Sequence, residues 1–125
     1  MDDKRSGENL ILDKSYQFSL MVIELYKFLI NEKKEYLLSK QLLRCGTSIG
    51  ANINEAQAAI SKKDFIAKVS IASKEARESK YWLMLLKDSG YINPSKHKVK
   101  LLLAEIDSII NITTKIVKSG QQNER

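Results

Sequence analysis

The sequence predicts an all-α protein, an antiparallel up-down-up-down four-helix bundle that occupies the whole chain, 1–125. Apolar residues recur at spacings of three and four through four segments, and the alternation that marks β-strands is missing. One proline and five glycines among 125 residues also favour long helices. Because the polar stretches between the segments are short, we expect neighbouring helices to be antiparallel and the chain to form one domain.

The first predicted helix covers about 13–31 and has two adjacent apolar stripes. One stripe comprises Leu12, Tyr16, Ser19, Ile23, Tyr26 and Ile30, and the other comprises Ile11, Ser15, Phe18, Val22, Leu25 and Leu29. This apolar face is wider than one partner helix would cover. The helix is therefore either the central core helix or one that presents an extra face to another subunit. The candidate oligomer-interface residues are Phe18, Val22, Trp82 and Leu85.

The other predicted helices are bounded by local signals. The second covers about 36–59, after the polar turn 31–35. Ser61 as N-cap and Asp64 three residues later predict a capping box for the third, about 62–89, which Gly90 would end. Asn93 as N-cap and Pro94 at the first helical position predict the fourth, about 94–118. Roughly the first eight residues and the tail 119–125 are expected to fray.

Two glycines, Gly46 and Gly50, lie inside the second predicted helix, where each costs about 0.5–1 kcal/mol relative to alanine. The third helix has small residues at its own apolar positions, and small residues let two backbones approach closely. The glycines therefore predict close packing of the second helix against the third, with a local kink at Gly50 as the alternative. Asn52, an amide among apolar residues, is hypothesised to fix helix alignment or assembly.

The sequence gives little support to catalysis. His97 is the only histidine and Cys45 the only cysteine, so a multi-histidine or multi-cysteine metal site is impossible within the chain. The glycine pair lacks the following Lys-Ser/Thr of a phosphate-binding loop. We therefore expect no enzyme activity, no catalytic or metal-binding residues and no cofactor. Glu55, Glu75 and Glu78 are interpreted as parts of a polar network between the second and third helices, or as solvated ion pairs.

The chain is basic, with a formal net charge of +6 and a pI near 9.4. At about 100° per residue, the basic residues of the third helix fall within an arc of roughly 140°. They are Lys62, Lys63, Lys74, Arg77, Lys80 and Lys87. Such an arc is either the solvated face of a helix or, repeated around a ring of subunits, a belt that binds phosphate backbones. Because no aromatic residues alternate with these cations, binding to RNA or DNA would be weakly selective.

Residues 48–56, SIGANINEA, resemble the S-I-(P/G)-x-N-I-x-E-(G/A) signature of the four-helix-bundle proteins encoded in 23S rRNA intervening sequences. Residues 41–44 are similar to the segment that precedes this signature, and 71–78 with 81–83 resemble the third helix of one branch. The resemblance covers about 10–118. Its structural-motif residues here are Gly46, Ser48, Ile49, Gly50, Asn52, Ile53 and Glu55. Gly50 replaces the proline of many members and so removes a fixed kink.

The resemblance implies a four-helix bundle, and some members form barrel-like homopentamers. The accessory protein of diversity-generating retroelements is a similar basic pentamer associated with nucleic acid and a reverse transcriptase. We therefore expect a non-enzymatic, ring-shaped homo-oligomer that binds RNA or DNA or scaffolds a nucleic-acid enzyme. The alternative is a protein-interaction module without nucleic-acid binding. A cytoplasmic location and no membrane partner are expected, because no apolar run reaches the roughly 18 residues of a membrane span and no signal-peptide pattern begins the chain.

Overall fold

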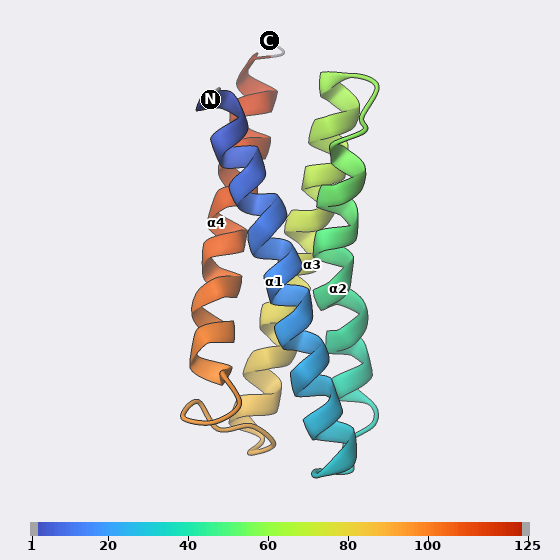
Figure 1. Cartoon of the computed structure of the whole chain (residues 1–125), viewed down its shortest axis with the longest axis vertical. Coiled ribbons are helices and arrows are strands. Elements are labelled where there is room, and N and C mark those ends of the chain that lie inside the picture. Colours follow the sequence, from blue (N-terminus) through green and yellow to red (C-terminus); the bar gives the residue numbers. More distant parts are fainter. Residues whose placement is uncertain (1–2, 124–125) are drawn as a thin grey trace.

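The computed structural model describes residues 3–123, which form four helices and no strand. α1 spans Asp3–Asn31, α2 spans Leu38–Ala56, α3 spans Lys62–Asp88 and α4 spans Val99–Asn123. Successive helices run in opposite directions, so that α1 begins and α4 finishes at the same end of the bundle (Figure 1). Within this range each helix packs against two neighbours, in the cyclic order α1, α2, α3, α4, and no pair packs across a diagonal. The all-α, four-helix prediction is confirmed.

The helix ends differ from the predicted ones at both ends of the chain. α1 begins at Asp3 instead of near residue 13, and α4 continues to Asn123 instead of stopping near residue 118. The expected fraying therefore does not apply to the helical residues 3–8 and 119–123, while residues 1–2 and 124–125 lie outside the described part of the chain. The polar residues at the start of α1 and at the end of α4 are thus part of these helices.

The core runs along the bundle axis and is made from one apolar stripe of each helix. Its largest fully buried side chains are Ile11, Phe18, Leu25 and Leu29 of α1, Leu42, Ile49 and Ile53 of α2, Leu83 and Leu86 of α3, and Leu102, Ile106 and Ile109 of α4. Buried hydroxyl groups bond to carbonyls of the preceding turn, as Thr113 Oγ1 does to Ile109 O at 2.8 Å. Among the described residues, no buried side-chain nitrogen or oxygen lacks a hydrogen-bond partner.

Both ends of α3 follow the signals in the sequence. The Asp64 N–H donates to Ser61 Oγ at 3.0 Å, and the Asp64 carboxylate accepts the Ile60 N–H at 3.3 Å. At the other end Gly90 has φ +86°, and the Tyr91 N–H donates to Leu86 O at 2.9 Å, which is the hydrogen bond of a Schellman motif. The Ser61 N-cap and the glycine C′ residue predicted for this helix are therefore confirmed, while the return bond of the predicted capping box goes to Ile60 instead of Ser61.

α2 begins at Leu38 rather than Tyr36 and ends at Ala56 rather than near residue 59. A buried carboxylate organises its first turn. Glu35 accepts backbone N–H groups from Leu37 at 3.2 Å and from Leu38 and Ser39 at 2.8 Å each. Burial opposes ionisation of Glu35, but these hydrogen bonds outweigh it and lower the pKa of its carboxyl below the usual value. Glu35 was not among the predicted capping residues, because it lies in a run of charged residues, NEKKE, that resembles a solvated turn.

α4 begins at Val99, five residues after the predicted start at Pro94. Asn93 does act as a cap, but for a turn: its side-chain oxygen accepts the Ser95 N–H at 3.0 Å. His97 and Lys98 then adopt positive φ values of 55° and 59°, which interrupt any helix. The imidazole of His97 stacks on Phe28 of α1 at a centroid distance of 3.8 Å, so a tertiary contact accompanies this conformation.

Gly46 and Gly50 lie where α2 approaches α1, so the prediction that they face the third helix is wrong. A Cβ at position 46 would lie 3.0 and 3.1 Å from the two γ-carbons of Val22. A Cβ at position 50 would lie 3.3 Å from the carbonyl oxygen of Ser15 and from Ser19 Oγ. The two glycines therefore permit close helix packing, as expected, but the neighbouring helix is α1. Periodicity had identified the correct residues without identifying the helix they contact.

Candidate nucleic-acid interface

The predicted basic residues of α3 lie on its solvent side, and two of them, Arg77 and Lys80, contact α4. Lys62, Lys63, Lys74 and Arg77 are exposed. Arg77 donates to Thr114 Oγ1 of α4 at 3.0 Å, and Lys80 forms an ion pair with Asp107 of α4 at 2.7 Å. Lys87 lies 3.6 Å from the Asp88 carboxylate. Such exposed pairs contribute little to stability, so a competing phosphate can replace the carboxylate at little cost.

Two lysines of α4 extend the same surface. Lys100 lies seven residues before Asp107, and Lys118 lies four residues after Thr114, so both share the helix face that contacts Arg77 and Lys80. Both lysines are exposed. We call this surface the α3–α4 basic face, and its basic members are Lys62, Lys63, Lys74, Arg77, Lys80, Lys87, Lys100 and Lys118. Lys100 and Lys118 were not among the predicted binding residues, because the sequence shows where cations lie on each helix but not which faces of two helices form one surface.

The basic residues of the α3–α4 basic face extend along most of α3. Lys63 and Lys87 are separated along α3 by about 36 Å at 1.5 Å per residue. That length matches about ten base pairs of duplex at about 3.4 Å each. Tyr81 lies on the same outer side of α3 with 58% of its surface exposed, and its ring meets Trp82 edge-on at 5.2 Å between centroids. The face thus combines a row of cations with one accessible aromatic ring.

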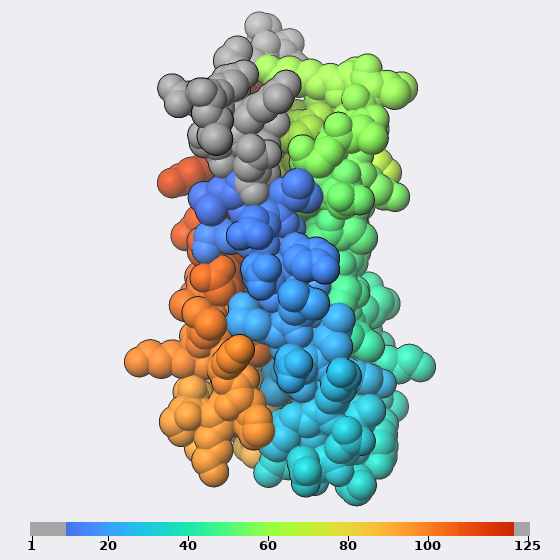
Figure 2. Space-filling view, viewed as in Figure 1, coloured from blue at the N-terminus to red at the C-terminus, as the bar shows by residue number. Residues whose placement is uncertain are grey.

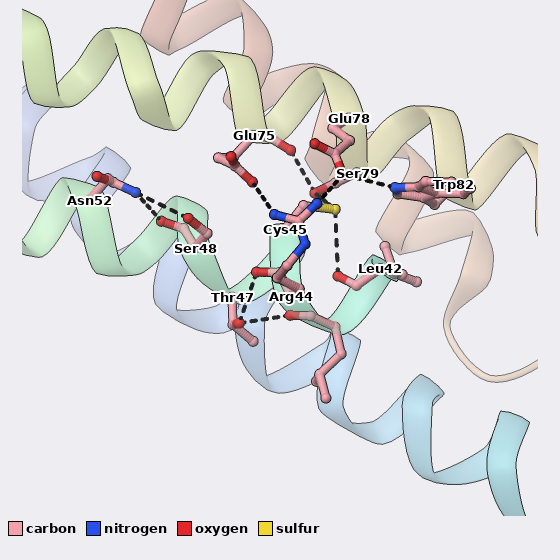
Figure 3. Close-up of polar contacts among 11 residues, drawn as sticks. Leu42, Arg44, Cys45, Thr47, Ser48, Asn52, Glu75, Glu78, Ser79 and Trp82 are labelled. Atoms are coloured by element: carbon pink, nitrogen blue, oxygen red, sulfur yellow. Dashed lines mark hydrogen bonds and ion pairs between the residues drawn. The ribbon is translucent and has the colours of Figure 1, made fainter. Parts of the chain in front are cut away.

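On the α2–α3 side, a polar network joins the two helices (Figure 3). The Arg44 guanidinium contacts the carboxylate of Glu75 at 3.5 Å and also bonds to Glu78. Trp82 Nε1 donates to the same Glu78 carboxylate at 3.1 Å. Lys68 of α3 pairs with Glu55 of α2 at 3.4 Å. Glu75 and Glu78 thus form a polar network with Arg44 and Trp82, whereas Glu55 and Lys68 form a separate, exposed ion pair, so each of the two predicted alternatives describes part of this side.

Asn52 takes no part in that network. Its side-chain amide donates to the carbonyl and the hydroxyl of Ser48, both one turn earlier in α2, at 2.9 and 3.1 Å. Figure 3 shows this pair lying apart from the Arg44 cluster. Both hydrogen bonds of the amide nitrogen stay within α2, so they do not join Asn52 to a neighbouring helix. The hypothesis that Asn52 fixes helix alignment or assembly stays a prediction.

The single cysteine and the single histidine occupy unrelated places. Burial is the largest influence on the Cys45 thiol and raises its pKa, and Ser79 Oγ lies 3.3 Å from its sulfur. A raised pKa lowers the thiolate fraction and hence the reactivity. His97 is exposed in the α3–α4 connection. Within residues 3–123, no three His, Cys, Asp or Glu side chains form a group that could hold a metal ion.

The predicted interface residues divide into two groups. Phe18 and Val22 are fully buried, with no exposed surface, so their assignment to a subunit interface is wrong. They belong to the α1 stripe that fills the core, whereas the other stripe borders solvent and includes Tyr16, which is 62% exposed. Trp82 and Leu85 are partly exposed on α3, and their role in an interface stays a prediction.

The family follows from comparison of the whole chain. The model of the 23S rRNA-intervening sequence protein family matches residues 7–115, which cover all of α2 and α3 and most of α1 and α4. The chain belongs to this family. A protein of unknown function of the S23 ribosomal protein family, from Bacteroides thetaiotaomicron VPI-5482, has a similar crystal structure. The two chains are 46% identical with a TM-score of 0.83, over 90% of this chain and 98% of the other. No curated protein is significantly similar in sequence to this chain.

The motif in residues 48–56 serves mainly to pack α2. Ile49 and Ile53 are fully buried, Gly50 and the preceding Gly46 contact α1, and Glu55 contacts α3. The basic residues lie outside the motif, on α3 and α4. None of the helices in residues 3–123 has an apolar stretch that would reach across a lipid bilayer.

Proposed function

We propose that this protein is a non-enzymatic homo-oligomer that binds RNA or DNA through the α3–α4 basic face. The protein acts as a binding or scaffolding component, and a nucleic-acid enzyme is the kind of partner that it would bring to a strand. The cations contact phosphates, which position a nucleic acid without identifying its sequence. Neither family membership nor the similar crystal structure specifies a ligand, so the proposal depends on the surface itself.

The continuity of the basic face across two helices supports this function most strongly. An isolated row of lysines on one helix is a common solvated surface, whereas here Lys100 and Lys118 of α4 extend the row on α3. The acidic residues Asp88 and Asp107 contact only Lys87 and Lys80 of the set. Cations on two neighbouring helices produce a positive potential that attracts a polyanion, and this attraction weakens steeply with salt.

Binding is expected to be weakly selective. The contacts available are lysine and arginine to phosphate, and these are the same for every sequence. Tyr81 offers one ring for stacking, which is fewer than the successive rings that sequence-tolerant single-strand binders use. The ligand is therefore recognised through its charge and backbone, and a duplex of about ten base pairs would cover the length of the face.

A fluorescence anisotropy titration tests this function. Labelled duplex and single-stranded oligonucleotides are titrated with protein at about 50 and about 200 mM salt, where binding to several phosphates should weaken steeply. In the duplex titration, removing the charges of Lys74 and Arg77 with Lys74→Gln/Arg77→Gln should reduce the slope of log K against log salt by up to about 1.8, at 0.9 per phosphate contact. The matched control, Lys27→Gln/Lys40→Gln, changes exposed lysines of α1 and α2 and should leave the slope close to that of the wild type.

Two results would contradict the proposed function. The first is the absence of binding to any oligonucleotide at about 50 mM salt, a condition that favours electrostatic contacts. The second is an equal loss of binding in the two double variants, which would mean that net charge rather than the α3–α4 face determines affinity. The first result, obtained with an assembled and folded protein, would favour the competing function, a protein-interaction module whose charge serves another partner.

A further inference from the structure

A small pocket lies within the α3–α4 basic face, beside two polar contacts that join these helices. It has a volume of about 440 Å³ and is lined by Arg77, Lys80, Asp107, Ile110 and Asn111. A water molecule occupies about 30 Å³ in the liquid, so the pocket has room for a phosphate group together with several waters. Arg77, Asp107 and Asn111 are exposed, so a ligand can reach the pocket from solvent.

Two cations of α3 line this pocket. Arg77 and Lys80 are three residues apart, a spacing that makes them neighbours on the surface of a helix. Arg77 donates to Thr114 Oγ1 at 3.0 Å, and Lys80 pairs with Asp107 at 2.7 Å. A guanidinium carries five N–H groups and an ammonium three, so these contacts leave donors on both side chains for a further oxyanion. α4 therefore positions both cations without using all their hydrogen bonds.

Asp107 supplies an oxyanion that is already present in the pocket. Its carboxylate makes a charge-assisted contact with Lys80, the kind of contact that lysine also makes with phosphate. Because the Lys80 and Asp107 side chains are 45% and 55% exposed, their pair changes an equilibrium constant by only about 1.4- to 5-fold. Asp107 thus marks a position where an oxyanion binds, and it also competes with an external phosphate for Lys80.

Asn111 adds a neutral donor on the α4 side of the pocket. It lies one turn after Asp107, in the part of α4 between Asp107 and Thr114. Its side-chain amide has two N–H groups that can donate to a phosphate oxygen. Amide side chains are among the groups that contact phosphates in nucleic-acid complexes. The pocket therefore combines two cations from one helix with an amide from the next.

The surrounding cations favour a backbone phosphate over a free one. Lys74 lies three residues before Arg77 on α3, and Lys100 lies seven residues before Asp107 on α4. Both lysines are exposed. A polyanion can contact these lysines and the pocket at the same time, whereas a free phosphate contacts the pocket alone. The extra contacts raise the affinity for a nucleic acid and make it depend on salt.

We propose that the pocket lined by Arg77, Lys80 and Asn111 binds one phosphate group of a nucleic-acid backbone, and that Asp107 weakens this binding by competing for Lys80. The inference rests on the proposed function and names a point at which the α3–α4 basic face holds the nucleic acid. On binding, Lys80 exchanges the carboxylate for a phosphate oxygen, while Arg77 and Asn111 add hydrogen bonds. Asp107 acts in the same way against every sequence, so it sets affinity without adding selectivity.

The duplex anisotropy titration at about 50 mM salt tests the role of Asp107. Asp107→Asn removes the competing carboxylate and should raise the affinity by up to about fivefold, which is the strength of an exposed pair. Glu55→Gln is the matched control, because Glu55 forms an exposed pair with another α3 lysine, Lys68, on the α2–α3 side. Figure 2 shows α2 and α4 on opposite sides of α1. Both variants gain one unit of positive charge, but the control should bind like the wild type.

A substitution without a charge change tests the amide. Asn111→Ala should lower the affinity for the duplex about two- to tenfold, the effect of losing one hydrogen bond. Asn54→Ala removes an exposed amide from α2 and should leave the affinity unchanged. Circular dichroism establishes that each variant is folded. An equal gain in Asp107→Asn and Glu55→Gln, or wild-type affinity in Asn111→Ala, would overturn the inference.

Inorganic phosphate, used alone, tests the pocket without a nucleic acid. In ¹⁵N-labelled protein, phosphate should shift the NMR signals of the Asn111 side-chain amide and the Arg77 Nε–H to saturation, and chloride at equal ionic strength should not. If oligonucleotides bind but phosphate produces no such shift and the variants bind like the wild type, the pocket fails and the proposed function stands. If phosphate saturates these signals and no oligonucleotide binds, the pocket is a phosphate site and the proposed function fails.

Discussion

The contact between Gly46 and Val22 gives the sharpest test of how α1 and α2 pack. A methyl group at position 46 would lie 3.0 and 3.1 Å from the γ-carbons of Val22. Carbon atoms in favourable contact are about 3.5–4.0 Å apart, so the two helices or the valine would have to move by roughly half an ångström. Val22 has no exposed surface and a β-branched side chain with few alternative rotamers, so it cannot move aside freely.

Two opposing terms set the expected effect of Gly46→Ala. Alanine gains about 1 kcal/mol over glycine in a helix interior, whereas overpacking a core costs about 1–3 kcal/mol. In the wild-type background the substitution should therefore lower the free energy of unfolding by about 0–2 kcal/mol. In a Val22→Ala background the obstructing γ-carbons are gone, and the same substitution should raise it by about 1 kcal/mol, because the propensity term acts alone and the new methyl fills vacated space.

Urea unfolding of the four proteins, followed by circular dichroism at one protein concentration, measures this cycle. The concentration is fixed because assembly would add to apparent stability. The expected result is a change of sign for Gly46→Ala between the two backgrounds. An identical effect in both backgrounds, within the 0.3–0.5 kcal/mol typical of independent sites, would refute the proposed contact.

Three other predictions concern the connections between helices. Glu35→Gln should lower the free energy of unfolding by about 1.5–3 kcal/mol at neutral pH. Folding lowers the pKa of Glu35, so the stability difference between wild type and Glu35→Gln should be fully present above the unfolded-state pKa. It should vanish as the pH falls through the native-state pKa. Urea unfolding at several pH values measures it, and a difference that stays constant with pH would contradict this account. Ser61→Ala should cost about 0.5–2 kcal/mol by loss of the α3 cap, against little change for the exposed mid-helix control Ser70→Ala. Lys98→Gly should raise the thermal unfolding midpoint, because the left-handed conformation at position 98 costs about 1–2 kcal/mol for a residue with a Cβ and much less for glycine. A lower midpoint would contradict that account.

The sequence predicted those parts of the fold that depend on neighbours in the chain. The α3 cap requires only Ser61 and Asp64, three residues apart, and the α3 end requires only a glycine that tolerates positive φ at position 90. Both were therefore correct. The start of α4 depends on more: His97 stacks on Phe28, which lies in a different helix and far away in sequence. No local sequence pattern predicts such a contact, and α4 begins at Val99 instead of at the predicted Asn93–Pro94 start.

The errors at α1 and α2 have a common physical origin. Helical periodicity shows which residues share a face, but a bundle helix has two neighbours, and periodicity does not say which face meets which neighbour. Gly46 and Gly50 were therefore assigned to α3 although they meet α1. The same ambiguity led to the choice of the Phe18 stripe for an interface, since both stripes of α1 are apolar and only packing shows that this one fills the core.

The motif residues pack the bundle and the exposed cations form its surface, and this difference limits what family membership can reveal about function. The residues of the 48–56 motif pack α2, bond within it or pair with α3, and each of these roles would be the same in a bundle that binds nothing. The cations of the α3–α4 basic face lie outside the 48–56 motif, at exposed positions that the packing of the core does not require to be basic. Membership of the family, which rests on residues 7–115 as a whole, therefore predicts architecture well, while ligand binding and assembly have to be tested on the surface of each member.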